Sequence, residues 1–357
     1  MFLENTNTNY VSLLKEKFPR LDESTEGILR YVDEQTELNS LKHGVGAKIH
    51  FSRSIIKIMG KDVLDYLHRV STNNVYNLAP NSAIGTLFLN EKGRFIDSSI
   101  LLHLEHEFLL IGNTDPHRRL LNWINKFIIV EEIHTFDQSD KLMVIDFFGP
   151  QSHSFLTMIL GSEIDKVVND SVKRFDVDGF TFYIFLNKIH ENINSYSIII
   201  ERDKCNAFVD YLIGITGAFD FSFVGETAFA HYRIINKMAA FPNEINDLTN
   251  PYEAELISNV SFTKGCYIGQ EVIARLDTYD KIQRQLIIMS STEFSDNLQP
   301  DIYDAEQNVV GQFTTLSSFS KSIFGLALVK KKSISNQVLL FAVNNGKMTE
   351  LEIEPEQ

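Results

Sequence analysis

The sequence predicts an α+β protein made of two α+β domains and a small C-terminal β-barrel. Its 357 residues are enough for two or three domains of ordinary size. Predicted strands and helices alternate through the first two thirds of the chain, which is typical of α+β domains. From Gln283 onward, short strands are separated by Asp, Asn, Gly and Ser turns, and this pattern indicates a barrel.

Composition narrows the classes of function. The formal charge is −14, from 33 basic and 47 acidic residues, which argues against sequence-independent nucleic-acid binding. The two cysteines, Cys205 and Cys266, do not form a zinc-binding motif, and so few cysteines suit a reducing compartment. No apolar run is long enough to span a membrane, and the first residues resemble neither a secretory signal nor an Arg-rich transit peptide. We therefore expect a cytoplasmic protein without a membrane segment.

The N-terminal part begins with a short amphipathic helix, indicated by Val11, Leu13, Leu14 and Phe18. Residues 47–58 alternate loosely and predict strands. A helix over residues 60–70 follows, with one apolar face, and turn-forming residues 71–74 end it.

A hairpin is predicted next. Its strands are residues 84–89 and 94–104, and Gly93 in the turn suits a left-handed conformation. Asp97 and Ser98 interrupt the otherwise apolar return strand and fall on opposite faces. They indicate either a partly exposed strand end or a functional acid.

The middle part repeats the alternation. Thr114-Asp115-Pro116 predicts a helix start, because it supplies a capping residue and a first-turn proline. The predicted elements that follow are strands 143–148, 179–186 and 196–200 and helices 151–161, 203–213 and 228–238. Cys205, in the first turn of one helix, is expected to be a buried or incidental thiol. Glu253, after Pro251, is expected to cap a helix or pair with an arginine.

The most informative stretch is Lys264-Gly265-Cys266-Tyr267-Ile268-Gly269-Gln270-Glu271, called the signature loop below. Gly265 is expected to adopt angles that a Cβ resists, and Gly269 to allow close backbone approach. After Gly269 an apolar stripe predicts a helix, so Cys266 would lie in a bend near its positive end. That position, with Lys264 nearby, would favour the reactive thiolate. The alternative is that Cys266 is a small buried hydrophobe.

This stretch resembles the signature of the YgfZ family of folate-binding proteins, matching eight positions with one of them free. The family is related to the T-protein (aminomethyltransferase) of the glycine cleavage system and includes mitochondrial factors that assist iron–sulfur cluster assembly. Flanking segments from about residue 40 onward also resemble it, most weakly between residues 150 and 225. The resemblance implies a three-domain ring of the T-protein type: residues 1–140 as a folate-binding domain, 141–275 as a middle domain with the signature loop, and 276–357 as the barrel.

The resemblance also implies roles for particular residues. Asp97 matches an acid that assists attack by the folate amine, although the T-protein has a second acid where this chain has Ser98. Tyr267 would stack on the pterin of tetrahydrofolate, while Gln270 and Glu271 would pair with its edge. Lys264 or Arg275 would bind the glutamate tail. Gly265, in the same loop, is also expected to be a cofactor-binding residue. Glu191 is a candidate for the pterin-recognising acid by proximity alone.

Three functions follow from the resemblance. The first is a tetrahydrofolate-binding accessory factor that assembles or repairs iron–sulfur enzymes through Cys266. The second is an aminomethyltransferase that uses a lipoyl carrier. The third is an indirect role in tRNA modification through an iron–sulfur enzyme. The expected partners are folate and iron–sulfur enzymes or their assembly proteins, without direct contact to nucleic acid. A ring within one chain favours a monomer.

Overall fold

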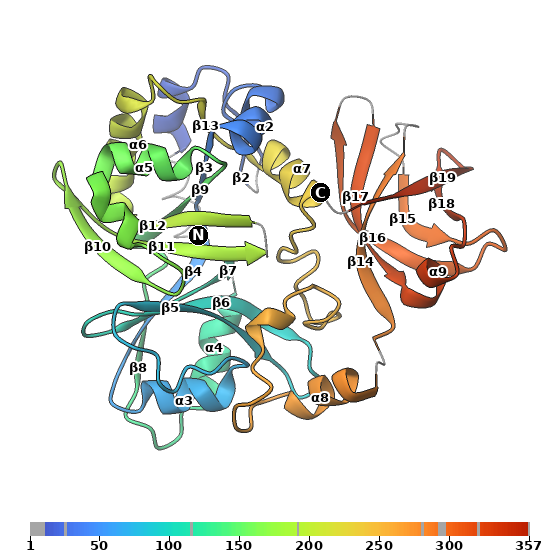
Figure 1. Ribbon diagram of the computed structural model, residues 1–357, viewed down its shortest axis with the longest axis horizontal. Coiled ribbons are helices and arrows are strands. Elements are labelled where there is room, and N and C mark those ends of the chain that lie inside the picture. Colours follow the sequence, from blue (N-terminus) through green and yellow to red (C-terminus); the bar gives the residue numbers. More distant parts are fainter. Residues whose placement is uncertain are drawn as a thin grey trace. The chain divides into compact units, whose positions relative to one another are not determined.

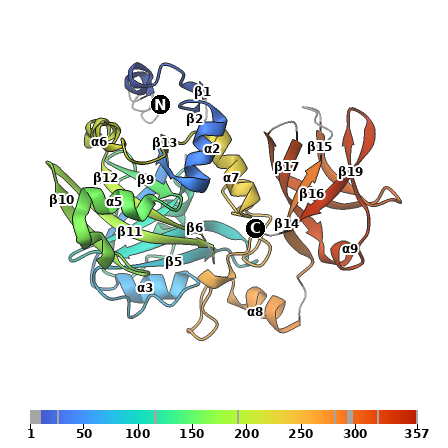
Figure 2. The ribbon, with the colours of Figure 1, turned by 45° about the horizontal axis from the view of Figure 1, so that its top comes forward.

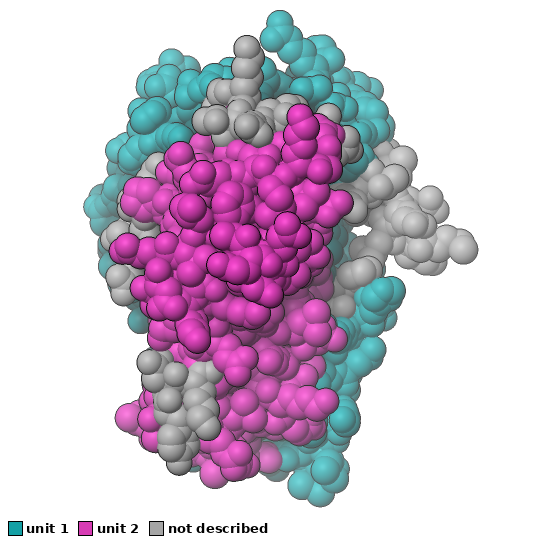
Figure 3. All heavy atoms as spheres, turned by 90° about the vertical axis from the view of Figure 1, so that its right-hand side faces the viewer, with its two compact units in different colours: residues 1–68, 74–86, 98–229 teal, residues 69–73, 87–97, 230–357 magenta. Residues whose placement is uncertain are grey.

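The computed structural model describes residues 11–24, 27–114, 117–190, 193–279, 282–291, 298–319 and 322–355. The chain divides into two compact units, which Figure 3 shows in two colours. Unit 1 contains residues 1–68, 74–86 and 98–229, and unit 2 contains residues 69–73, 87–97 and 230–357. Unit 2 thus joins the C-terminal part of the chain to two short segments from its first hundred residues.

A six-stranded sheet with helices on one face forms much of unit 1 (Figure 1). In spatial order its strands are β10 (Val172–Val177), β11 (Phe180–His190), β12 (Ile193–Glu201), β9 (Leu142–Phe148), β3 (Val45–His50) and β13 (Phe221–Phe223). The helices α5 (Ser152–Leu160) and α6 (Arg202–Ile215) supply Phe155 and Phe208 to a core shared with Ile145 and Ile198. The predicted strands 143–148, 179–186 and 196–200 and the predicted helices 151–161 and 203–213 are therefore confirmed, and β3 adds a strand from the N-terminal part to their sheet.

The second sheet contains five strands. In spatial order they are β5 (Ser82–Leu89), β6 (Phe95–His103), β7 (Phe108–Thr114), β4 (Arg53–Met59) and β8 (His134–Asp137). Ile55 and Leu109 of this sheet pack with Val144 and Ile199 of the first in one buried cluster. Side chains alternate between the two faces of a strand, so β9 and β12 supply apolar side chains to both of their faces. One of these faces packs against the second sheet, and the two sheets therefore lie face to face.

Helices and capping groups complete unit 1. Residues 11–17 are helical as predicted, and Leu14 is fully buried in the core. The helix α2 (Glu34–His43) begins where Asp33 Oδ1 accepts the N–H of Thr36 at 2.9 Å. The predicted helix after residue 60 is α3 (Val63–Val70). The short strands β1 (Asp22–Ser24) and β2 (Gly27–Arg30) pair with each other, and the 3-10 helix η1 (Gly161–Lys166) follows α5.

The predicted helix start at Thr114 is wrong. Thr114 is the last residue of β7, and Asp115 and Pro116 lie outside the described residues. The helix α4 (Arg119–Lys126) begins later, after Arg118 with a left-handed φ of 53°. Leu120 and Ile124 of this helix are fully buried. Ladder pairing of Thr114 with Arg53 of β4 overrides the local capping signal.

Unit 2 contains the predicted C-terminal barrel. Its strands close in the order β14 (Arg284–Ser291), β17 (Ser322–Lys330), β16 (Val309–Phe319), β15 (Leu298–Tyr303), β18 (Leu340–Asn344) and β19 (Lys347–Glu354) (Figure 2). Met289, Ile302 and Ala327 are fully buried inside it. The short helix α9 (Lys331–Ser335) follows β17, and the helix α7 (Glu226–Ile235), the 3-10 helix η2 (Ile257–Asn259) and the helix α8 (Gln270–Tyr279) precede the barrel.

The helices that the structure describes include none that is long and apolar enough to cross a membrane.

Candidate functional site

The hairpin between β5 and β6 presents a buried carboxylate. Its turn has the predicted form: Gly93 has a φ of +68°, and Asn90 Oδ1 accepts the N–H groups of Lys92 and Arg94 at 2.9 and 3.1 Å. Beyond the turn, Phe95 and Asp97 lie on the buried face with exposures of 0% and 2%. The interpretation of Asp97 as a partly exposed strand end is therefore wrong. Transferring a carboxylate from water into the protein interior costs free energy, and a buried acid at this hairpin stays a functional candidate.

Lys264 anchors the signature loop. Its ammonium group donates to the carbonyl oxygens of Ser71 and Asn73 at 2.7 and 2.8 Å, and the residue is only 9% exposed. Beside it, the Ser261 N–H donates to the Thr72 carbonyl at 3.0 Å. Burial lowers the pKa of Lys264 to about 8. These bonds attach the loop to the segment after α3.

Tyr267 belongs to the core of unit 2. It is 8% exposed and lies in a cluster with Leu89, Phe95 and Ile273. The Lys264 ammonium lies 5.4 Å from the centre of its ring, a cation–π contact. Burial raises the pKa of Tyr267 to about 12. Because Phe95 and Asp97 share a strand face, this core places the signature loop and the Asp97 strand side by side.

Gly269 brings the start of α8 against the hairpin turn. Its φ is +87°, and a Cβ at this position would lie 2.6 Å from the Asn90 carbonyl oxygen. The predicted close approach is confirmed, as is the predicted helix, whose Ile273 is fully buried. Gly265 differs from its prediction: its φ is outside the left-handed range, and a Cβ would meet nothing within 4 Å. A side chain would therefore fit there without strain.

Cys266 is exposed, and Cys205 is buried in the core of unit 1. The alternative that Cys266 is a buried hydrophobe is therefore wrong, whereas the expectation of a buried Cys205 is confirmed. Cys266 lies four residues before α8, between the buried side chains of Lys264 and Tyr267. The loop thus holds the side chains of Lys264 and Tyr267 in the protein interior and leaves the thiol of Cys266 accessible.

The other candidate ligand residues, Gln270, Glu271 and Arg275, lie on the first turns of α8. Glu271 and Arg275 form an ion pair one turn apart, with side-chain exposures of 77% and 69%. Gln270, the first residue of the helix, is half-buried. Glu191 lies outside the described residues. The structure therefore brings Lys264, Tyr267 and the Asp97 strand to one core, whereas Glu271 and Arg275 face solvent. The predicted ligand roles of all these residues stay predictions.

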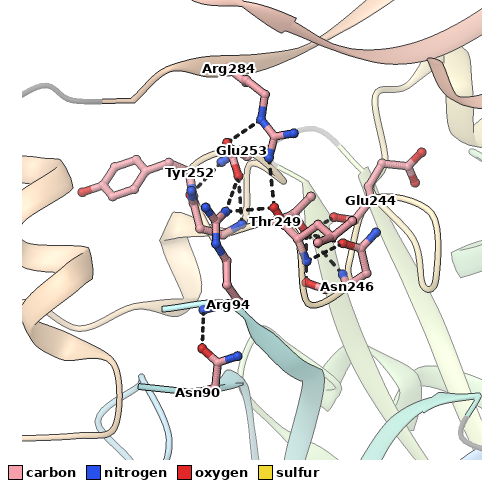
Figure 4. Close-up of polar contacts among 10 residues, drawn as sticks. Asn90, Arg94, Glu244, Asn246, Thr249, Tyr252, Glu253 and Arg284 are labelled. Carbon is pink, nitrogen blue, oxygen red and sulfur yellow. Dashed lines mark hydrogen bonds and ion pairs between the residues drawn. The ribbon is translucent and has the colours of Figure 1, made fainter. Parts of the chain in front are cut away.

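Glu253 is the centre of a second polar cluster (Figure 4). Its side chain is 5% exposed and accepts from Arg94 Nη1 at 2.9 Å and from Arg284 Nε at 2.8 Å. Both arginines also donate to the Leu248 carbonyl oxygen at 2.9 Å. The predicted pairing of Glu253 with an arginine is confirmed. Neither Arg94 nor Arg284 was predicted, because no local pattern marks two arginines that meet only after folding.

A third network connects the segment after α7 to the barrel. Arg233 Nη1 donates to Glu244 Oε2 at 2.7 Å, and Arg233 Nη2 donates to Thr315 Oγ1 at 2.7 Å. The side chain of Glu244 is fully buried. This pairing fixes the segment that leads to the signature loop. No group of three or more potential metal ligands occurs among the described residues.

The family model described as the GCVT N-terminal domain matches residues 34–264, which is more than half of the chain. The chain belongs to this family. The match contains both sheets, Asp97 and Lys264, and it ends at the first residue of the signature loop.

Several curated proteins are similar to this GCVT-domain chain. A chloroplastic protein of Arabidopsis thaliana, named as a candidate transferase, is 25% identical, covering 92% of the chain and 76% of its own length. An aminomethyltransferase of Thermotoga sp. (strain RQ2) is 22% identical, with coverages of 84% and 82%. The mitochondrial iron–sulfur cluster assembly factor IBA57 homologue of Dictyostelium discoideum is 25% identical, covering 67% of the chain and 61% of the relative.

A solved structure shares the fold. The glycine cleavage system aminomethyltransferase T from Bartonella henselae matches with a TM-score of 0.80 at 17% identity, covering 96% of this chain and 95% of its own. The GCVT-domain chain therefore has the T-protein fold, with the closed barrel at its C-terminus, as the sequence predicted.

Proposed function

We propose that this protein is a tetrahydrofolate-binding accessory factor for the assembly or repair of iron–sulfur enzymes, in the YgfZ branch of its family. The observation that carries the proposal is the exposed Cys266 on a loop whose neighbouring side chains are buried. The eight-position signature and the similarity to an IBA57 homologue support it. A cytoplasmic monomer without direct nucleic-acid contact, and an indirect effect on tRNA modification, belong to the same proposal.

The chain's own groups fit folate in part. Asp97 is a buried carboxylate and could accept a hydrogen bond from a folate amine. Gln270 supplies an amide, and Arg275 an exposed cation. Lys264 and Tyr267 are less available, because the ammonium group is bonded to two carbonyls and the ring is buried. When bound, tetrahydrofolate would supply an acceptor for one-carbon units.

Cys266 would act on a partner rather than within its own core. A thiolate is both a nucleophile and a ligand for iron, and an accessible loop lets it reach a protein surface. Burial of Lys264 and Tyr267 holds the backbone on both sides of the thiol. The loop can therefore present Cys266 in one position without ordering it on contact.

Complementation of a strain that lacks its own protein of this kind tests the proposal. We expect wild-type protein to restore the activity of an iron–sulfur enzyme in that strain and Cys266→Ala to fail at equal abundance. Cys205→Ala is the matched control, because it removes the buried thiol. Full restoration by Cys266→Ala would contradict the proposed role of the exposed thiol.

Aminomethyl transfer is the second candidate, and the burial of Asp97 favours it. This acid matches the position that assists folate attack in the T-protein, and its buried carboxylate could hold the proton of the folate amine. The serine at position 98 departs from the T-protein pattern. An assay with an aminomethylated lipoyl carrier and tetrahydrofolate decides: ammonia release that Asp97→Asn abolishes would establish the transferase, whereas no release by folded wild-type protein would exclude it.

A further inference from the structure

Two arginines in unit 2 share one buried carboxylate. Arg94 comes from the hairpin turn and Arg284 from the start of β14, and Figure 4 shows both pointing toward Glu253. The guanidinium groups carry two positive charges against one negative charge. The cluster therefore keeps one positive charge in a chain whose formal charge is −14.

Hydrogen-bond donors on both arginines remain available. Arg94 uses only Nη1, for Glu253 and Leu248, and Arg284 uses Nε and Nη2. Within the described residues, Nε and Nη2 of Arg94 and Nη1 of Arg284 have no acceptor. The side chains of Arg94 and Arg284 are 34% and 36% exposed, so solvent or a ligand can reach them.

Hydrogen bonds within the loop that carries Glu253 hold the cluster in place. Glu253 Oε2 also accepts the N–H of Asn250 at 3.2 Å, and Asn250 Oδ1 accepts the N–H groups of Tyr252 and Glu253. The carbonyl oxygen of Leu248 gives each guanidinium group a second acceptor. Two prepositioned guanidinium groups with free N–H groups are the arrangement that recognises planar or tetrahedral oxyanions.

We propose that Arg94 and Arg284, positioned by Glu253, bind an oxyanion, the carboxylate or phosphate group of a small ligand. The group could belong to the glutamate tail of folate, in which case this inference rests on the proposed function, or to a separate small anion. The chemistry is shared by both sources. A structural ion pair needs only one cation per carboxylate, and the second arginine supplies the charge that an anion would neutralise.

Calorimetric titration at low ionic strength tests the site without a pterin. The probes are inorganic phosphate and penta-γ-glutamate, added to wild type, Arg94→Gln and Arg284→Gln, with Arg174→Gln as the control because Arg174 is an exposed arginine paired with Asp176. We expect binding by wild type and by the control, about tenfold weaker binding by either test variant, and loss of affinity with added salt. Arg284→Lys keeps the charge without the planar fork and should bind with intermediate affinity if the glutamine variant does not fold.

Folates with glutamate tails of different length distinguish the two sources of the anion, the folate tail and a separate small anion. If the tail is the ligand, tetrahydrofolate with five glutamates binds wild type more tightly than the monoglutamate, and Arg284→Gln removes the difference. Phosphate binding that depends on the arginines, with no effect of tail length or no folate binding at all, supports a separate anion and leaves this site standing without the folate proposal. No binding of either pterin-free probe to wild type, or unchanged affinity in both glutamine variants, overturns the inference.

Discussion

Among single residues, Lys264 has the environment that most affects the signature loop. A buried ammonium group loses hydration, and its two carbonyl acceptors and the Tyr267 ring replace only part of it. The lowered pKa records that loss. Lys264, two residues before Cys266, is therefore charged in the folded protein only at a cost in stability.

The pH dependence of stability tests this account. With a folded pKa of about 8 and a higher pKa in the unfolded chain, the unfolded state binds more protons above pH 8, so the contribution of Lys264 to stability rises with pH there. We expect the free energy of unfolding of wild type, relative to Lys264→Met, to increase between pH 7 and pH 9 by at most about 1 kcal/mol, because solvent screens part of the penalty. Urea unfolding of both proteins at several pH values measures it, and a constant difference would contradict the buried charge.

At the scale of elements, the contact between α8 and the hairpin turn depends on one glycine. Alanine at 269 would place its Cβ against the Asn90 carbonyl oxygen and would adopt an unfavourable positive φ. We expect Gly269→Ala to lower the free energy of unfolding by about 2 kcal/mol, and Gly265→Ala, in open space, by less than about 0.5 kcal/mol. Equal effects in chemical denaturation would mean that this contact does not hold the loop.

The Glu253 cluster joins three elements of unit 2: the hairpin turn, the loop before η2 and the first barrel strand. Removing its carboxylate leaves two guanidinium groups facing each other without a counter-charge. We expect Glu253→Gln to lower the free energy of unfolding by about 2 kcal/mol, below the range for a fully buried pair because the arginines are partly exposed. Glu271→Gln, in an exposed pair on α8, should change it by about 0.5 kcal/mol or less. Thermal or urea unfolding compares the two variants. Similar losses in the free energy of unfolding would mean that the Glu253 cluster does not hold these three elements together.

For the whole molecule, local sequence signals predicted the elements but not their meeting points. The hairpin turn, α8 and the barrel strands follow from turn residues and periodicity, which act over a few positions. By contrast, Arg94 and Glu253 are separated by 159 positions, and Lys264 and Ser71 by 193. The sequence therefore predicted Lys264 and Asp97 as site residues, but it could not show that Lys264 is bonded to backbone carbonyls and that Asp97 is buried. Distant pairing also explains why the helix predicted at Thr114 is the end of a strand.

Binding of tetrahydrofolate tests the central claim most directly. Anaerobic calorimetric titration measures the affinity of wild type and of Cys266→Ala for tetrahydrofolate. The comparison separates binding of the ligand by the fold from a role of the thiol after binding. We predict comparable binding by both proteins, because Cys266 is exposed and its loop is held by its neighbours. No binding by wild type that is shown to be folded would contradict the folate part of the account and would leave a thiol-based role with a partner protein.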